Sequence, residues 1–222
     1  MRKDFLTLEK NGFLVRTHGG AVAVYGGKMV ELKNLKNRLV DFPELKKEVA
    51  ENAVSFINEG DVVPIDAGTT AIYIAQLLAK RFNRLTVVTY CMSKFERLKD
   101  VKNFKVILAG GEFIPEENAF TGHLTTETLS KLHVMKSFVL PAAISVQNGI
   151  GYMHKEFVES AKMLIEMADK IFVVGDSSKY EHYAMYKISE TEKNYTYITD
   201  SEISQDIVNK YKKSGLKLVG RK

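Results

Sequence analysis

Asp66-Ala67-Gly68-Thr69-Thr70 combines residue types that can bind a phosphate group. The segment follows an apolar run at residues 62–65 that is typical of a buried strand, and it precedes a helical pattern that begins at Ala71. Gly68 allows a tight turn, and the two threonines place hydroxyl groups at the start of the helix. Backbone N–H groups are free there, and the helix dipole is positive. The same residues would also form an ordinary strand-to-helix turn with a threonine cap, so the segment alone leaves both interpretations open.

Three further polar segments follow predicted strands or open predicted helices: Gly110-Gly111-Glu112, Thr121-Gly122 and Asp176-Ser177-Ser178-Lys179. The carboxyl ends of parallel strands share one edge of an open α/β sheet, where ligands bind. Lys179 would supply a positive charge for a phosphate, and Asp66 and Asp176 could accept from sugar hydroxyls or orient Lys179. Each segment alone is also consistent with turn glycines, a helix cap or a surface lysine. Together they predict one shared site for a small anion.

Positioning these segments requires a sheet with helices on both sides. The expected strands cover residues 62–65, 85–90, 104–109, 137–140, 170–175, 195–199 and 217–219, and the expected helices cover residues 44–57, 70–82, 93–98, 123–133, 156–168 and 203–212. β-branched runs that alternate with amphipathic helices are typical of a parallel sheet covered on both faces. The sequence therefore predicts the α/β class with a mostly parallel sheet.

Composition narrows the functional classes. The chain has 222 residues, of which 45% are hydrophobic and 27% charged, as in ordinary globular proteins. No apolar run approaches the roughly 20 residues that a membrane span needs, and the start of the chain lacks a signal-peptide pattern. The single cysteine, Cys91, fits a reducing compartment, and no Cys/His spacing suggests zinc. We therefore expect a cytoplasmic protein without a membrane segment, a metal or a cofactor.

Positive charge is concentrated at the N-terminal end. Residues 1–42 contain eight Lys/Arg and four Asp/Glu, whereas the remaining 180 residues contain 24 and 23. Residues 1–10 have the pattern of the end of an amphipathic helix, which Asn11-Gly12 would stop, and residues 13–22 could form a hairpin that turns at His18-Gly19-Gly20. A helix followed by a small basic hairpin is the ending of a winged helix-turn-helix that reads DNA.

We expect three parts: residues 1–24 as the remnant of a winged helix-turn-helix, 25–43 as a linker, and 44–222 as the domain that holds the anion site. A complete helix-turn-helix needs two earlier helices, which this sequence does not contain. The remnant is therefore expected to reflect a truncation, proteolysis or a mis-set start.

The chain resembles the DeoR-type bacterial repressors. The N-terminal similarity is carried by Arg2-Lys3-Asp4, Leu8-Glu9, Gly12, Leu14, Arg16 and His18-Gly19-Gly20-Ala21. The C-terminal similarity is carried by residues 65–70, Leu108-Ala109-Gly110-Gly111, Phe120-Thr121-Gly122 and Asp176-Ser177-Ser178-Lys179. The resemblance implies a sugar-phosphate-sensing transcription factor that forms homodimers or larger oligomers, with a sensor similar in fold to ribose-5-phosphate isomerases. It also implies DNA contacts from Arg2, Lys3, Arg16 and His18. The effector contacts it implies are Asp66, Gly68, Thr69, Thr70, Gly110, Gly111, Thr121, Gly122, Glu156, Asp176 and Lys179.

The sequence departs from the family pattern in one pocket segment. The family's glycine-rich run Phe-x-Gly-x-x-Gly-Ile-Asp corresponds here to residues 138–145, where Leu140, Ala143 and Ser145 replace both glycines and the acid. The family's later Glu and Lys are matched to Glu156 and Lys162.

Three functions follow as hypotheses. The first is a repressor whose sensor domain binds a phosphorylated sugar or polyol and thereby releases operator DNA by a population shift. The second is a sugar-phosphate isomerase-like enzyme, for which Asp66, Glu112, Glu156, Asp176 and Lys179 could supply acid–base groups, although residues 140–145 carry no acid. The third is an oligomerisation domain that has lost its ligand. We expect a regulator with no catalytic residues.

Overall fold

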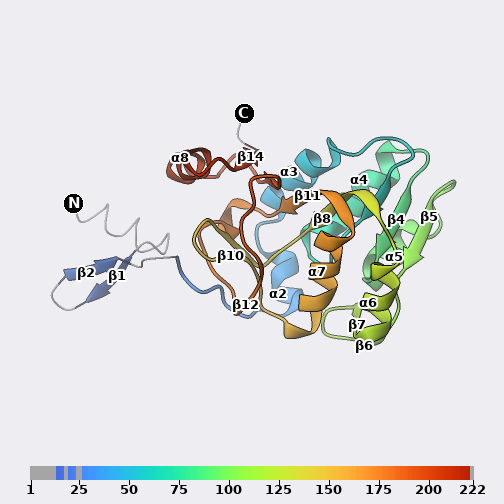
Figure 1. Ribbon diagram of the computed structural model, residues 1–222, viewed down its shortest axis with the longest axis horizontal. Helices are drawn as coiled ribbons and strands as arrows, with labels where there is room; N and C mark the ends of the chain where they lie inside the picture. Colours follow the sequence, from blue (N-terminus) through green and yellow to red (C-terminus); the bar gives the residue numbers. More distant parts are fainter. Residues whose placement is uncertain (1–13, 18–19, 24–26, 221–222) are drawn as a thin grey trace.

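The computed structural model describes residues 14–17, 20–23 and 27–220, and its centre is a parallel sheet (Figure 1). Two runs of parallel strands have the orders β14-β13-β11-β8 and β3-β4-β5. A parallel bridge between Ile65 and Phe138 joins β8 to β3, so the seven strands form one continuous twisted layer. These strands are β3 (Val62–Pro64), β4 (Thr86–Thr89), β5 (Lys105–Leu108), β8 (Val134–Val139), β11 (Ala168–Val174), β13 (Thr196–Ile198) and β14 (Lys217–Val219). All seven strands expected from the sequence are confirmed.

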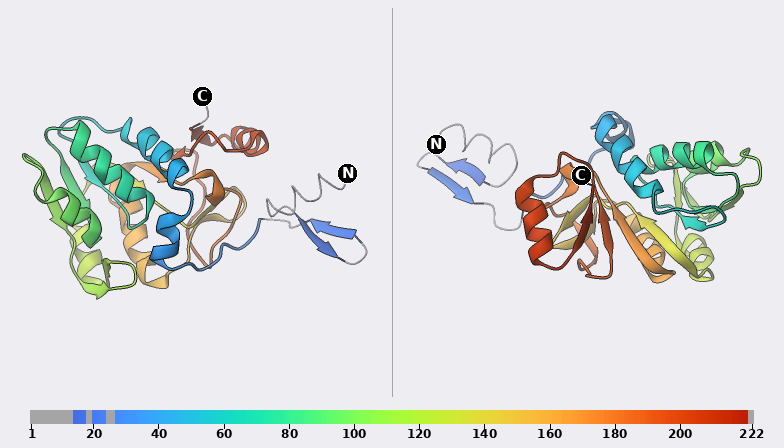
Figure 2. Two further views of the ribbon diagram at one scale, coloured as in Figure 1. Left: turned by 180° about the vertical axis from the view of Figure 1, so that it is seen from behind. Right: turned by 90° about the horizontal axis from the view of Figure 1, so that it is seen from above.

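Helices cover both faces of this sheet. They are α3 (Pro43–Val54), α4 (Thr70–Arg81), α5 (Met92–Leu98), α6 (His123–Ser130), α7 (Val158–Glu166) and α8 (Gln205–Lys213). Figure 2 (right) shows α3 and α4, in blue and green, on one side of the sheet, and α6 and α7, in yellow-green and orange, on the other. The prediction of helices on both faces is confirmed.

Alternating strand residues belong to two separate hydrophobic clusters. Phe138, Phe172 and Val174 pack with the buried residues of α3 and α4, whereas their neighbours Val139 and Val173 pack with those of α6, α7 and α8. Successive side chains of a strand point to opposite faces, so a strand buried on both faces needs an unbroken apolar run. This requirement explains why the central strands could be recognised from composition.

The sequence analysis did not predict the antiparallel additions. They are the pair β6 (Glu112–Ile114) and β7 (Ala119–Thr121), and the sheet β12-β10-β9, whose strands are β9 (Ala143–Ser145), β10 (Gly149–Tyr152) and β12 (Tyr186–Ser189). β9 and β10 are buried along their whole length, and each has a single isoleucine among mostly small residues, so they lack the alternation and the β-branched runs that indicate strands. The start of the expected helix at 156 is also different: Lys155–Phe157 form a 3₁₀ turn, η1, ahead of α7.

The N-terminal hairpin is confirmed at the level of the backbone. β1 (Leu14–Thr17) pairs with β2 (Gly20–Ala23) in antiparallel register, with Thr17 opposite Gly20. Arg16 lies in β1, whereas Arg2, Lys3, His18 and the expected helix at 1–10 lie outside the described residues. Among the residues that the structure describes, no helix has the length and apolar character needed to cross a membrane.

Candidate functional site

Two adjoining cavities open at the carboxyl ends of β3, β8 and β11. The larger has a volume of about 800 Å³ and the smaller about 80 Å³. Both are lined by Thr69, Asp176 and Lys179, which come from two of the segments singled out in the sequence. The ends of β3 and β11 lie on either side of β8 in the sheet, so their following turns meet across it. The structure thus brings residues 66–70 and 176–179 to one place.

The corner at residues 66–70 presents groups that can bind an anion. α4 starts at Thr70 with Thr69 as its N-cap, and the Thr69 side chain makes no capping hydrogen bond. Within the described part of the chain, the backbone N–H groups of Gly68, Thr69 and Thr70 and both threonine hydroxyls have no hydrogen-bond partner. A β-carbon on Gly68 would lie 3.2 Å from Cβ of Leu140, so the turn packs closely against the end of β8. Free donors at a helix N-terminus match the chemistry of a phosphate.

Asp66 is wholly buried and holds this corner in place. One carboxylate oxygen accepts from the N–H of Ala67 (2.7 Å) and from the Tyr90 hydroxyl, and the other accepts from the N–H of Leu140 (2.8 Å) and from the Tyr152 hydroxyl. Burial raises the pKa of Asp66, although all four hydrogen bonds favour its charged form. With both oxygens fully used, Asp66 positions the turn and the end of β8 rather than accepting from a ligand hydroxyl.

Asp176 and Lys179 come from the turn after β11. Asp176 caps η2 (Ser177–Lys179), and its Oδ1 accepts from the N–H of Ser178 (3.2 Å) and from the Ser178 hydroxyl. Its other oxygen, Oδ2, is buried and has no partner among the described residues. The Lys179 ammonium makes no hydrogen bond within the described part of the chain. A buried acceptor and a free cation on one cavity wall suit a ligand that carries both hydroxyl and anionic groups.

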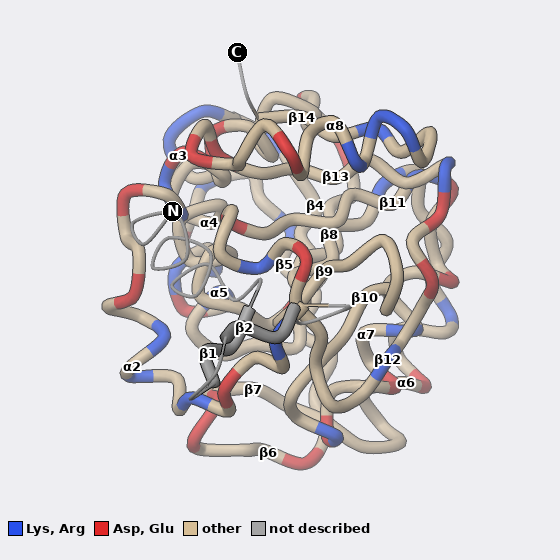
Figure 3. The backbone as a smooth tube through the Cα atoms, turned by 90° about the vertical axis from the view of Figure 1, so that its left-hand side faces the viewer, with Lys and Arg blue, Asp and Glu red and all other residues tan. Residues whose placement is uncertain are grey.

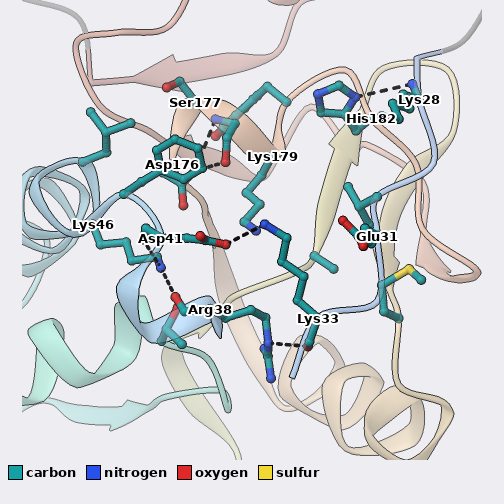
Figure 4. Close-up of a pocket in the computed structure, with 18 of the residues that line it drawn as sticks. Lys28, Glu31, Lys33, Arg38, Asp41, Lys46, Asp176, Ser177, Lys179 and His182 are labelled. Carbon is teal, nitrogen blue, oxygen red and sulfur yellow. Dashed lines mark hydrogen bonds and ion pairs between the residues drawn. The ribbon is translucent and has the colours of Figure 1, made fainter. Parts of the chain in front are cut away.

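Residues 28–42, here called the α2 segment, form much of the wall of the larger cavity. The segment contains α2 (Leu35–Val40) and contributes Lys28, Lys33, Arg38 and Asp41 to the lining. Figure 4 shows Lys179 from above and Lys33 from below reaching toward the same end of Asp41, and Lys33 pairs with Asp41 at 2.8 Å. That hydrogen bond is the main reason why the pKa of Asp41 lies below its usual value, and Lys179 adds to the effect. This segment falls within residues 25–43, which were predicted from the sequence to be a charged, moderately helical linker.

Lys46 of α3 holds the end of the α2 segment through hydrogen bonds. Its side chain is 3% exposed, and its ammonium donates to the backbone carbonyls of Arg38 and Asp41, the latter at 2.5 Å. Burial lowers the pKa of Lys46, and Lys179 and Arg38 act in the same direction. A buried ammonium at the C-terminal end of a short helix forms strong, charge-assisted hydrogen bonds with the last carbonyl groups of that helix.

Glu117 makes a second polar contact with the α2 segment, at the rim of the smaller cavity. Its side chain is 8% exposed, and its carboxylate forms an ion pair with Arg38 and lies 3.3 Å from Nε2 of His154. All three residues line the smaller cavity. The sequence offered no signal for this cluster, because its members lie on three separate loops or helices far apart in the chain.

Five other residues predicted for the site line neither cavity: Gly110, Gly111, Thr121, Gly122 and Glu156. They meet one another instead. The Thr125 hydroxyl contacts the carbonyls of Gly110 (3.1 Å) and Thr121 (2.9 Å), and the Thr121 hydroxyl donates to the carbonyl of Glu156. β5 is an edge strand, two places from the β3–β8 junction, so the turn that follows it ends beside α6 and not in the central crevice. These residues brace the sheet edge.

Within the described ranges, no three His, Cys, Asp or Glu side chains gather in the manner of a metal site. Cys91 is buried at the start of α5, and its thiol lies 3.1 Å from the ammonium of Lys94. Neither residue lines either of the two cavities.

Acidification is expected to loosen the start of the α2 segment. Nδ1 of His182 accepts from the N–H of Lys28 (3.4 Å). Burial lowers the pKa of His182 from 6.5, the charges of Lys179 and Lys28 act in the same direction, and the charge of Glu181 and the hydrogen bond from Lys28 oppose the shift. The unfolded chain therefore takes up a proton on this residue before the folded protein does, so stability falls as the pH drops below 6.5. Urea unfolding from pH 7 to about pH 5 should show a shallower loss for His182→Gln than for the native chain. Identical pH profiles would contradict this assignment.

Comparison with known proteins places this geometry in context. The DeoR C-terminal sensor domain matches residues 42–201. The chain is 32% identical to the uncharacterized HTH-type transcriptional regulator YulB of Bacillus subtilis, over 90% of this chain and 76% of that protein. It is 30% identical to the lactose phosphotransferase system repressor of Lactococcus lactis, over 91% of this chain and 79% of that protein. Ribose 5 phosphate isomerase A from Neisseria gonorrhoeae superposes with a TM-score of 0.45 and 19% identity, over 62% of this chain and 53% of that chain.

Proposed function

This chain belongs to the family of DeoR C-terminal sensor domains, and from that premise we propose that it is a DNA-binding transcriptional regulator with a sensor for a phosphorylated sugar or polyol. The observation that carries the proposal is the corner at residues 66–70. Its N–H groups and hydroxyls, which have no hydrogen-bond partner among the described residues, share one cavity with the Lys179 ammonium, which likewise has none there. The names of the relatives, which include the lactose phosphotransferase system repressor and a putative aga operon transcriptional repressor of Escherichia coli, support a link to sugar metabolism.

In this proposal the phosphate accepts hydrogen bonds from the N–H groups of Gly68, Thr69 and Thr70, from the Thr70 hydroxyl and from the ammonium of Lys179. A sugar hydroxyl donates to Oδ2 of Asp176, the buried oxygen that lacks a partner within the described residues. Leu140, Pro141 and Ala142 supply an apolar part of the cavity lining beside the corner, so the ligand would be held mainly through its phosphate and one edge of the sugar.

Arg2, Lys3, Arg16 and His18 are proposed to contact operator DNA in a homodimer or larger oligomer. Effector binding would shift the population toward a conformation in which paired DNA-binding elements no longer match the operator spacing. Phosphate contacts to DNA make affinity fall steeply with salt, so salt-dependent promoter binding is the matching measurement. The proposal places the protein in the cytoplasm, where operator DNA and phosphorylated sugars are both present.

A thermal-shift screen tests the sensor function. Phosphorylated sugars and polyols should raise the melting temperature, and the same compounds without phosphate should not. A ligand at 100 times its Kd adds about 2.7 kcal/mol, which corresponds to about 5–10 °C for a chain of this size. A panel without any active compound would overturn the proposal. Conversion of an aldose phosphate to a ketose phosphate at ordinary enzyme rates would favour the isomerase hypothesis instead.

A further inference from the structure

The α2 segment is held to the rest of the protein by hydrogen bonds and ion pairs rather than by core packing. α2 contains no buried residue, and the side chains of Val40 and Phe42 are 75% and 52% exposed. These contacts include the backbone bonds between Lys28, Val30 and Tyr183, the bond from the N–H of Lys28 to His182, the Arg38–Glu117 ion pair and the two bonds from Lys46. Elements with few buried apolar contacts open locally at low free-energy cost. This segment can therefore change its position without disturbing either hydrophobic cluster.

Arg38 is the residue through which the α2 segment reaches the anion site. It lines both cavities, and among the residues that line the smaller cavity the only Lys or Arg side chains are Arg38 and Lys179. Lys179 belongs to the body of the domain, so the second positive charge comes from the α2 segment. A dianion in the smaller cavity would also lie beside Glu117 and Asp176, and it needs both cations to offset them.

The guanidinium of Arg38 has N–H donors that none of its hydrogen bonds to described residues uses. Its Nε donates to the carbonyl of Lys33 (3.1 Å), and Nη2 pairs with Glu117. Nη1 makes no hydrogen bond within the described part of the chain. Arginine carries five N–H donors in a planar fork that matches a phosphate in a bidentate manner. Glu117 therefore holds Arg38 ready at the cavity rim without using all of its donors.

We propose that Arg38 clamps the anionic group of the bound effector and so closes the α2 segment over the cavity. The inference rests on the proposed function for its ligand, but it assigns a contact and a coupling path that lie outside the matched range 42–201. In the chain, the α2 segment follows the hairpin β1–β2, which ends at Ala23. Occupancy of the cavity is thereby transmitted along the chain to the part that carries the proposed DNA contacts. Figure 3 shows the basic positions of α2 at the edge of the molecule, below α3 and α4.

Hydrogen exchange with inorganic phosphate as the probe tests the clamp. The N–H groups of Arg38 and Asp41 are hydrogen-bonded within α2, to the carbonyls of Asn34 and Asn37. Saturating phosphate should slow their exchange by about tenfold, because closure suppresses local opening. In Arg38→Ala, phosphate should bind about tenfold more weakly or worse and should leave α2 exchange unchanged. Arg81→Ala, which removes an arginine paired with Glu51 at the surface, should behave like the native chain in both respects.

The results of these measurements distinguish failure of the Arg38 clamp from failure of the proposed function. Unchanged or faster α2 exchange in saturating phosphate, or equal phosphate affinity in Arg38→Ala and the native chain, would overturn the clamp and leave the proposed function standing. Failure of inorganic phosphate to raise the melting temperature would also overturn it. If, in addition, no phosphorylated sugar or polyol stabilises the protein, the proposed function fails as well. Because α2 buries no side chain, Arg38→Ala is expected to fold, and its melting temperature without ligand verifies this.

Discussion

Asp66→Ala is expected to lower the free energy of unfolding by about 3–5 kcal/mol, because it leaves four buried donors without an acceptor. Two of these donors are backbone N–H groups, of Ala67 and Leu140, which cannot turn elsewhere. The other two are the hydroxyls of Tyr90 and Tyr152, whose pKa values are raised well above 10 by burial, so both stay protonated. Chemical denaturation measures the change, and the melting temperature should fall by about 10 °C.

Matched variants separate this role from a general effect of losing an aspartate. Asp100→Ala removes a carboxylate that is 83% exposed and paired only with Lys99, so its effect should stay within about 0.5 kcal/mol. Asp66→Asn keeps the shape but replaces one acceptor oxygen by an NH₂ group, and it should cost about 1–3 kcal/mol. If Asp66→Ala destabilised the protein no more than Asp100→Ala, Asp66 would not be the residue that holds the corner.

Combining Thr70→Val with Lys179→Ala is expected to weaken binding of a phosphorylated effector by at least about 100-fold, because each removed hydrogen bond to a charged group contributes about 1.5–3 kcal/mol. Valine matches the shape of threonine, and the Thr70 hydroxyl has no partner within the described chain, so folding should be retained. Isothermal titration with the most stabilising compound of the thermal-shift panel measures the loss. A melting temperature without ligand close to that of the native chain verifies the fold.

The control pair for this variant lies at the end of α6, where Thr128 is in the last turn of the helix and Lys131 is its C-cap. Thr128→Val with Lys131→Ala makes the same chemical changes at a hydroxyl that donates to the carbonyl of Leu124 and at an ammonium paired with Glu127. It should leave effector affinity unchanged, because neither residue lines a cavity. Equal affinity of the Thr70/Lys179 variant and this control would exclude the corner at 66–70 as the phosphate site.

The parallel sheet could be predicted because burial on both faces demands largely apolar runs, and such runs are visible at residues 62–65, 137–140 and 170–175. The convergence of the corner at 66–70 with Lys179 also followed from the sequence, since both segments come directly after such runs. The hairpin after residue 13 was likewise recognisable from its turn residues. These inferences depend on local pattern and on the general rule for the edge of a parallel sheet.

Strand order was decided only by the tertiary structure. Gly110 and Gly111 follow a strand as clearly as Gly68 does, yet β5 lies at the sheet edge and its turn faces α6. The role of Asp66 was also hidden, because the donors that occupy it include Leu140, Tyr90 and Tyr152, which come from separate parts of the chain. The α2 segment was interpreted as a charged linker because the residues that hold it, chiefly Glu117 and Lys46, do so through polar contacts. Such contacts leave no apolar pattern in the sequence. Local spacing determines which elements form, whereas packing between them determines which of their polar ends meet.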